Sequence, residues 1–205
     1  MTDRSTTDLH TDISYMRSLA EQGRRGPILG GAFLAAAGLV FGCAAFVQGA
    51  MQAGYLASFP IGDIWIGAGV LFAAIWVALF LRLRGSGEGV RPGTNQYAFG
   101  MAWSGAGAGI VVLILAIAIE STRMNAAVME AANGLVAFAF YGTAWLVSGA
   151  LARQRWMFVA AAAAFGFTLL LAYLANTPAQ VLALGIALIL TLTLPGLQLV
   201  RQASR

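Results

Sequence analysis

Six long apolar runs alternate with short polar segments along most of this chain. They cover residues 27–49, 61–83, 97–119, 131–152, 156–175 and 178–200. Each run is close to the length of about 20 residues that an α-helix needs to cross the hydrocarbon core of a bilayer. The runs lack the polar–apolar alternation of a transmembrane barrel. The pattern therefore predicts an all-α, polytopic membrane protein with six transmembrane helices.

Proline residues set the expected limits of the first and last helices. Pro27 and Pro178 stand at the start of an apolar run, and proline fits the first turn of a helix, where its missing N–H would be unsatisfied anyway. Pro178 therefore separates the fifth and sixth helices, which would otherwise read as one. Pro195 lies inside the sixth run and is expected to kink its inner end.

Composition agrees with a membrane location. Hydrophobic residues make up 60% of the chain and charged residues only 10%, with a mean hydropathy of +0.79, whereas soluble domains contain about 25% charged residues. The net charge of +4 comes from arginines at the edges of the apolar runs, so it does not indicate a nucleic-acid partner. The lipid bilayer is the expected surrounding.

The arginines also predict an orientation. If the N-terminus is cytoplasmic, 11 of the 12 arginines fall in cytoplasmic segments, and only Arg123 lies outside. Basic residues in short loops favour the cytoplasmic side. We therefore expect a multi-pass protein of a bacterial inner (cytoplasmic) membrane with both termini in the cytoplasm. Its parts are a cytoplasmic segment 1–26, a helix bundle 27–200 and a cytoplasmic tail 201–205.

The N-terminal segment is the one part suited to water. Between residues 8 and 22, apolar side chains recur at the spacing of one helix face, which predicts a short amphipathic helix. Such a helix needs a surface to lie against, because isolated helices of this length are marginal in water. That surface is either lipid and the protein's own loops, or a cytoplasmic or membrane protein partner. The candidate partner-binding residues are Leu9, Ile13, Met16, Arg17 and Ala20.

Three acidic residues are expected to gather at the outer face. Asp63 and Glu130 stand near predicted helix starts and Glu120 near a helix end, with Arg123 in the loop between the last two. Acidic side chains at a helix start interact favourably with the helix dipole. This interaction would explain the positions of Asp63 and Glu130 without any function. The alternative is an outer mouth that gathers cations or a polar ligand, formed by Asp63, Glu120 and Glu130.

The spans lack the residues that most chemistry requires. No Asp, Glu, Arg or His lies in the middle of a run, although proton pathways usually keep such a group in the membrane and haem needs axial ligands. The single histidine, His10, has no metal-binding companion, and the single cysteine, Cys43, is expected to behave as a small buried apolar residue. We expect no enzyme activity, no metal and no cofactor.

Small residues suggest how the helices pack. Gly38 and Gly42 in the first helix, and Gly105 and Gly109 in the third, have the spacing that allows close helix–helix approach, within one bundle or at a dimer interface. At an offset of 69 residues, Gly31, Gly38, Trp76 and Arg84 align with Gly100, Gly107, Trp145 and Arg153. The six helices could therefore be three related hairpins, although an alanine- and glycine-rich chain also produces such matches by coincidence.

The opening of the chain carries a resemblance. Residues 12–24, which include the string YMRSLAEQGR, are followed by Pro27 and Gly30-Gly31. This stretch resembles the start of a group of small bacterial inner-membrane proteins that share a YMRxLAExGR-type opening. It covers about the first 31 residues. The resemblance implies a bacterial multi-span protein and implies no particular activity.

These patterns favour a non-enzymatic accessory or regulatory membrane protein whose N-terminal helix contacts a partner. The alternative is a transporter or channel for a small uncharged or apolar solute. A transporter should enclose a continuous cavity lined by the polar residues of the spans, whereas a scaffold should be tightly packed. Those polar residues are Gln48, Asn133, Tyr141, Thr143, Ser148, Thr168, Thr191 and Thr193.

Overall fold

The computed structural model describes residues 30–57, 59–85, 94–120, 126–175 and 177–203, and in parts of three helices it describes the backbone alone. These ranges are helical and contain no strand. The elements are α2 (Gly31–Gln52), α3 (Ile61–Gly85), α4 (Thr94–Glu120), α5 (Ala126–Ala152) and α6 (Arg155–Tyr173), followed by α7 (Pro178–Leu188), the π-helical segment η1 (Ile189–Thr193) and α8 (Leu194–Ala203).

The helices lie where the six apolar runs predict them. The last three elements form one continuous helix, and Pro178 occupies its first turn as expected. Pro195 lies near the start of α8, directly after the π-helical segment. The expected kink at Pro195 therefore takes the form of a local widening of the helix just before the proline. Pro27 lies outside the described residues.

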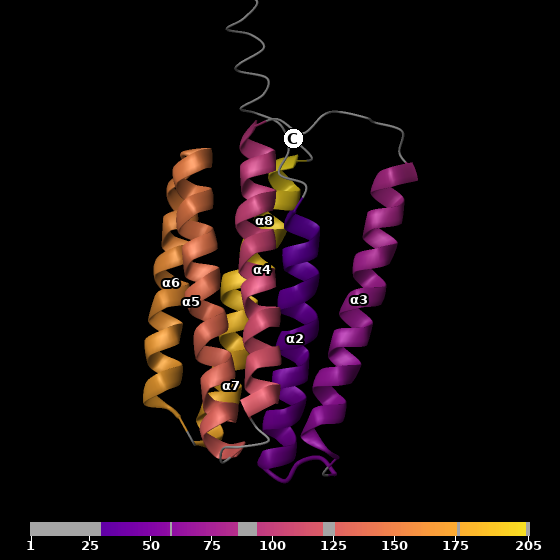
Figure 1. Cartoon of the computed structure of the whole chain (residues 1–205), viewed down its shortest axis with the longest axis vertical. Helices are drawn as coiled ribbons and strands as arrows, with labels where there is room; N and C mark the ends of the chain where they lie inside the picture. Colours follow the sequence, from indigo (N-terminus) through magenta and orange to yellow (C-terminus); the bar gives the residue numbers. More distant parts are fainter. Residues whose placement is uncertain (1–29, 58, 86–93, 121–125, 176, 204–205) are drawn as a thin grey trace, which may run out of the picture.

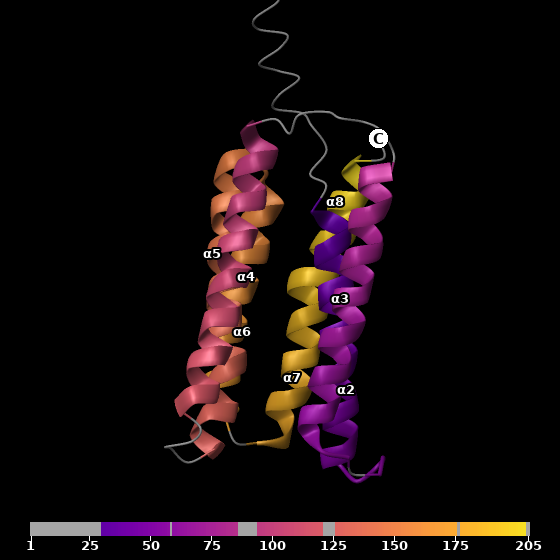
Figure 2. The ribbon, with the colours of Figure 1, turned by 45° about the vertical axis from the view of Figure 1, so that its right-hand side comes forward.

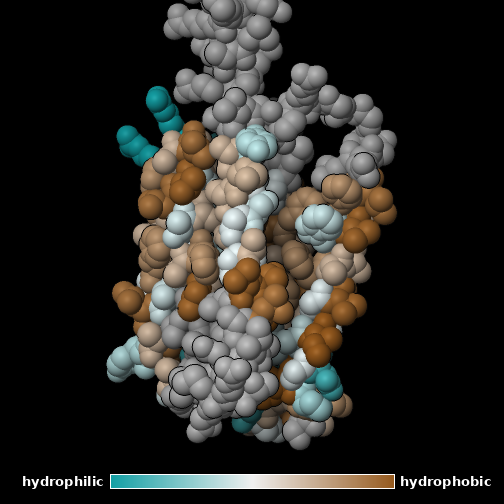
Figure 3. Space-filling view, viewed as in Figure 1, coloured by the Kyte–Doolittle hydropathy of each residue, from teal (hydrophilic) through white to brown (hydrophobic). Residues whose placement is uncertain are grey.

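The surface of the helices is strongly apolar. Four of them are long and apolar enough to cross a membrane: Gly31–Gln52, Ile61–Arg82, Arg155–Tyr173 and Pro178–Ala203. Shorter apolar stretches, Tyr97–Val112 and Val136–Ala152, lie in α4 and α5. On the face shown in Figure 3, hydrophobic residues cover the middle of the molecule and the most hydrophilic residues lie at its two ends. These features suggest a membrane location.

The helices run alternately up and down and form two groups (Figures 1 and 2). In the first unit, α2 is central and packs against α3 and against the continuous helix α7–η1–α8. In the second unit, α5 is central and packs against α4 and α6. The start of α2 and the end of α8 lie at the same end of the molecule (Figure 1). We call the contact surface between the two units the seam.

Glycines bring the helices of the first unit into backbone contact. A Cβ atom on Gly38 would lie 2.6 Å from the Thr193 nitrogen and 2.8 Å from the Leu188 oxygen, distances that no real side chain tolerates. A Cβ on Gly42 would lie 3.0 Å from the Ile189 side chain. The prediction that Gly38 and Gly42 serve packing within the bundle is therefore confirmed. Gly105, by contrast, has nothing within 4 Å of its Cβ position.

Residues that align at an offset of 69 do not have similar surroundings in the structure. Gly31 and Gly38 press against the continuous helix, whereas their counterparts Gly100 and Gly107 have nothing within 4 Å. Trp76 is 44% exposed, whereas its counterpart Trp145 is fully buried. The structure therefore gives no support to three equivalent hairpins.

Candidate functional site

The candidate partner-binding stripe of Leu9, Ile13, Met16, Arg17 and Ala20 lies outside the described residues, as does His10. Cys43 is exposed on α2, so the expectation of a buried thiol was wrong. It points away from the neighbouring helices because the opposite face of α2, which includes Gly38, Gly42 and Gly49, makes the close contacts.

The three outer acids are divided between the two units. Asp63 is exposed in the first turn of α3, and Glu120 ends α4, both as expected. Glu130 is the fifth residue of α5 and lies beyond its first turn, so the helix-dipole explanation fails for it, because that effect fades within one turn. The side chains of Glu120 and Glu130 are not among those described. A shared ligand mouth stays a prediction.

The central helices of the two units share a ten-residue pattern that the sequence analysis missed. Residues 41–50 read FGCAAFVQGA, and residues 141–150 read YGTAWLVSGA. Five positions are identical, and the others pair residues such as Phe41 with Tyr141. An alignment of the chain with itself at an offset of 100 residues would have found this match.

The shared pattern occupies equivalent positions in the two units. Buried residues recur at the same places, from Gly42 to Gly49 in α2 and from Gly142 to Gly149 in α5. The two helices run in opposite directions (Figure 1). Weak internal symmetry between segments of opposite direction is typical of many transporter folds. The two units are thus built around related helices of inverted orientation.

The neighbours of α2 and α5 correspond as well. On one face, the Phe41 ring lies against Phe72 of α3, with 5.4 Å between ring centroids, and the Tyr141 ring stacks on Trp103 of α4 at 6.1 Å. On another face, Gly49 meets α7 and Gly149 meets α6. Each central helix therefore uses matching faces to hold its two partners.

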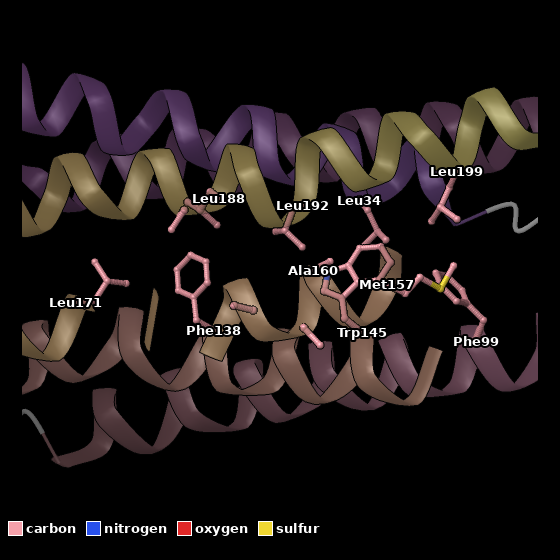
Figure 4. Packing of buried hydrophobic residues seen from close by; sticks show 13 residues of the cluster. Leu34, Phe99, Phe138, Trp145, Met157, Ala160, Leu171, Leu188, Leu192 and Leu199 are labelled. Carbon is pink, nitrogen blue, oxygen red and sulfur yellow. The ribbon is translucent and has the colours of Figure 1, made fainter. Parts of the chain in front are cut away.

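The hydrophobic core lies in the seam. Figure 4 shows its side chains between a layer formed by α2, α7, η1 and α8 and a layer formed by α4, α5 and α6. Phe138, Trp145 and Met157 expose none of their surface. A water-sized void beside these side chains would leave part of them accessible, so the seam is closed around them. The labelled residues are Leu34, Leu188, Leu192 and Leu199 from the first unit and Phe99, Phe138, Trp145, Met157, Ala160 and Leu171 from the second.

A hydrogen bond crosses the seam where the continuous helix is irregular. In the π-helical segment the backbone N–H of Leu194 donates to Ile189 O, five residues earlier. Pro195 has no N–H to donate to the carbonyl four residues before it, which is that of Thr191. The Thr191 carbonyl instead accepts a hydrogen bond from Nε1 of Trp145, at 2.8 Å. A side chain of the second unit thus satisfies a backbone group that proline leaves open in the first.

Trp145 stands at the centre of an aromatic cluster. Its ring contacts Trp103 edge-on with centroids 4.9 Å apart, Trp156 at 5.6 Å and Phe99 at 6.5 Å. The indole N–H of Trp156 bonds to the side chain of Gln154, whereas the buried Nε1 of Trp103 has no hydrogen-bond partner. Among these indoles, that of Trp145 is the one that bonds across the seam.

Four of the polar side chains in the apolar runs bond within their own helix. The hydroxyl groups of Thr143, Ser148, Thr168 and Thr191 each donate to the carbonyl four residues earlier. Gln48 is different, because its Oε1 accepts a bond from Trp65 Nε1 of α3 at 2.8 Å. The buried Thr193 hydroxyl has no partner. Gln48 therefore bonds to a neighbouring helix, while these four hydroxyls bond locally.

The described residues contain no group of three or more His, Cys, Asp or Glu side chains placed to hold a metal ion. The notable chemistry of the described part is thus the closed seam and the hydrogen bond that crosses it. Searches with protein-family models, among curated proteins and among solved structures found no match to this chain.

Proposed function

We propose that the chain spans a bacterial inner membrane six times, with both termini in the cytoplasm. Six helical rods of alternating direction support the number of spans, and the start of α2 and the end of α8 lie at the same end of the molecule. The distribution of arginines supports the orientation. Reporter fusions after Arg84, Arg153 and Arg205 should give cytoplasmic signals, and fusions at Ser58 and Asn125 outer signals. An outer signal after Arg205 would contradict the proposal.

Within that membrane we propose a non-enzymatic accessory or regulatory role, and the closed seam is the observation that carries it. Of the polar residues that could line a solute path, Thr191 is fully buried, Ser148 is 1% exposed and Gln48 is 5% exposed. Their side chains are also occupied by hydrogen bonds. A scaffold needs such a packed interior, whereas a solute pathway needs polar groups that a solute can reach.

The partner contact is proposed at the cytoplasmic N-terminal helix. On the predicted helix, Leu9, Ile13 and Met16 form an apolar stripe that lies outside the six apolar runs, so we expect it to need a separate surface to cover it. Burial of side chains of this size contributes roughly 1.5–3 kcal/mol each relative to exposure. Two of them are therefore enough to change an affinity by orders of magnitude.

The docking proposal is tested by replacing Leu9 and Ile13 with serine in the full-length protein. After purification from native membranes, mass spectrometry should show that co-purifying proteins are lost while the protein still inserts normally. Asp12→Ser, on the polar side of the same predicted helix, is the matched control and should retain them. If the doubly substituted protein keeps every partner, the docking role fails and the helix is a surface anchor.

A second candidate is the transport of a small uncharged or apolar solute. It is favoured by the related, oppositely directed helices α2 and α5 and by the π-helical segment just before Pro195 in the continuous helix. Transporter folds commonly place their sites where inverted repeats meet and where a helix is interrupted. This candidate requires a second state in which the seam is open.

A further inference from the structure

The two units are held together differently from the helices within each unit. In the first unit, Gly38 allows backbone contact with Thr193, and in the second unit, Gly149 brings α5 close to Met157, where an added Cβ would lie 3.2 Å from the Met157 Cβ. Across the seam, α6 lies close to α7 and η1, where the core combines buried alanines such as Ala160 with large apolar side chains such as Leu192 and Phe138. Backbone contact through glycine thus belongs to the units, whereas alanines and large apolar side chains fill the seam.

A bilayer makes this difference important. Lipid tails are as apolar as leucine, so no hydrophobic driving force holds one transmembrane helix to another, and association depends on packing and on hydrogen bonds. Acyl chains can therefore replace much of what the leucines and phenylalanines of the seam contribute. They cannot replace a hydrogen bond, because hydrocarbon offers no acceptor or donor.

The hydrogen bond from Trp145 joins the units about halfway along the continuous helix. Thr191 is the fourteenth of the 26 residues from Pro178 to Ala203. Its carbonyl lacks the ordinary intrahelical donor because of Pro195. If the seam opened, both this carbonyl and the indole N–H of Trp145 would lose their hydrogen-bond partner. The Gln180 amide also reaches across, to Leu171 O at 3.4 Å, but it lies next to the α6–α7 connection, which joins the units covalently.

We propose that Trp145 and Thr191 form a latch that holds the two units in a closed state, and that the π-helical segment with Pro195 is the hinge. When the latch opens, α5 and the continuous helix separate, and the continuous helix bends where its backbone bonding is already irregular. π-helical segments are frequent at functional sites. The related helix α2 has Ala45 at the position of Trp145, so the latch is present on one side only. The proposal requires the membrane location but neither candidate function.

The experiment measures the distance between the two units in lipid nanodiscs. The chain has a single cysteine, Cys43, which is exposed on α2, and the equivalent position on α5, Thr143, is also exposed. Spin labels on Cys43 and on the Thr143→Cys variant therefore report on the units from matched positions. With the latch intact, double electron–electron resonance should give one narrow distance distribution.

The indole N–H of Trp145 is then removed by substitutions that keep an aromatic ring in its place. Trp145→Phe should add a second distance, with the ratio of open to closed states raised by about threefold to twentyfold, the range expected for one interhelical hydrogen bond in a membrane. Trp103→Phe makes the same change of ring at an indole that has no hydrogen-bond partner, and should leave the distribution unchanged. Replacing Trp145 with benzothienylalanine, which keeps the ring shape but lacks the N–H, should reproduce the Trp145→Phe result even if the smaller phenylalanine ring packs poorly.

Pro195→Ala tests the hinge. Alanine restores an N–H that can donate to the Thr191 carbonyl, so the Trp145→Phe substitution should open the seam less in this background than in the parent. An unchanged distance distribution in Trp145→Phe and in the benzothienylalanine protein would overturn the latch. An equal response to Trp103→Phe would show that ring volume alone matters and would also overturn it. An undiminished effect in the Pro195→Ala background would overturn the hinge.

Discussion

Helices α2 and α5 carry the same ten-residue pattern, yet they hold their neighbours by different means. In α2, Gly38 lies four residues before the shared Gly42 and admits the backbone of the continuous helix. In α5, the corresponding residue is Phe138, which is fully buried in the seam. Ala45 of α2 likewise corresponds to Trp145 of α5. The pattern therefore fixes which faces of a helix are buried, and the size of a few side chains decides what each face meets.

The largest expected effect concerns Trp145. Trp145→Ala should lower the free energy of unfolding by about 3–5 kcal/mol, because it leaves a cavity in a closed core. The matched control is Trp76→Ala, at the position aligned with Trp145 at an offset of 69 residues but 44% exposed, which should cost well under half as much. Unfolding in bicelles under a chemical denaturant measures both. Equal losses of stability in the two variants would contradict the conclusion that Trp145 lies in a closed core and Trp76 does not.

A smaller effect is expected from adding one methyl group at Gly38. Gly38→Ala forces apart two helix backbones and should cost about 1–3 kcal/mol, as overpacking of a close contact does. Gly107→Ala adds the same group where nothing lies within 4 Å, and alanine is the better helix former, so stability should be unchanged or slightly higher. The same unfolding assay applies. If Gly107→Ala lowered the free energy of unfolding as much as Gly38→Ala, the conclusion that only Gly38 is in close backbone contact would be contradicted.

The smallest effect separates Gln48 from Ser148, which occupy the same place in the shared pattern. Gln48→Ala removes the bond from Trp65 and should cost about 0.6 kcal/mol, the average for interhelical bonds measured in a membrane protein. Ser148→Ala removes a bond within one helix and should cost less. In a double-mutant cycle, Gln48→Ala and Trp65→Phe should be coupled. Additive losses would show that this hydrogen bond does not stabilise the first unit.

Much of the fold could be predicted from the sequence because each span is a local feature. A helix in a bilayer must satisfy its own backbone, so an apolar run of sufficient length specifies a helix without reference to its neighbours. The six runs accordingly match the described helices, and Pro178 starts a helix because its ring fixes the first turn. The candidate residues near the N-terminus lie outside the described ranges and stay predictions.

The grouping of those helices was decided only by tertiary structure. Apolar side chains on every face of a helix do not reveal which face meets protein and which meets lipid, since both are equally apolar. For this reason the sequence could not distinguish Gly38, which is in backbone contact, from Gly107, which is open. Nor could it show that the Thr191 carbonyl, which loses its intrahelical donor because of Pro195, accepts a hydrogen bond from Trp145, 46 residues earlier in the chain. The sequence determined the helices, because each is a local feature. Contacts between distant and similarly apolar surfaces determined the two units and the seam.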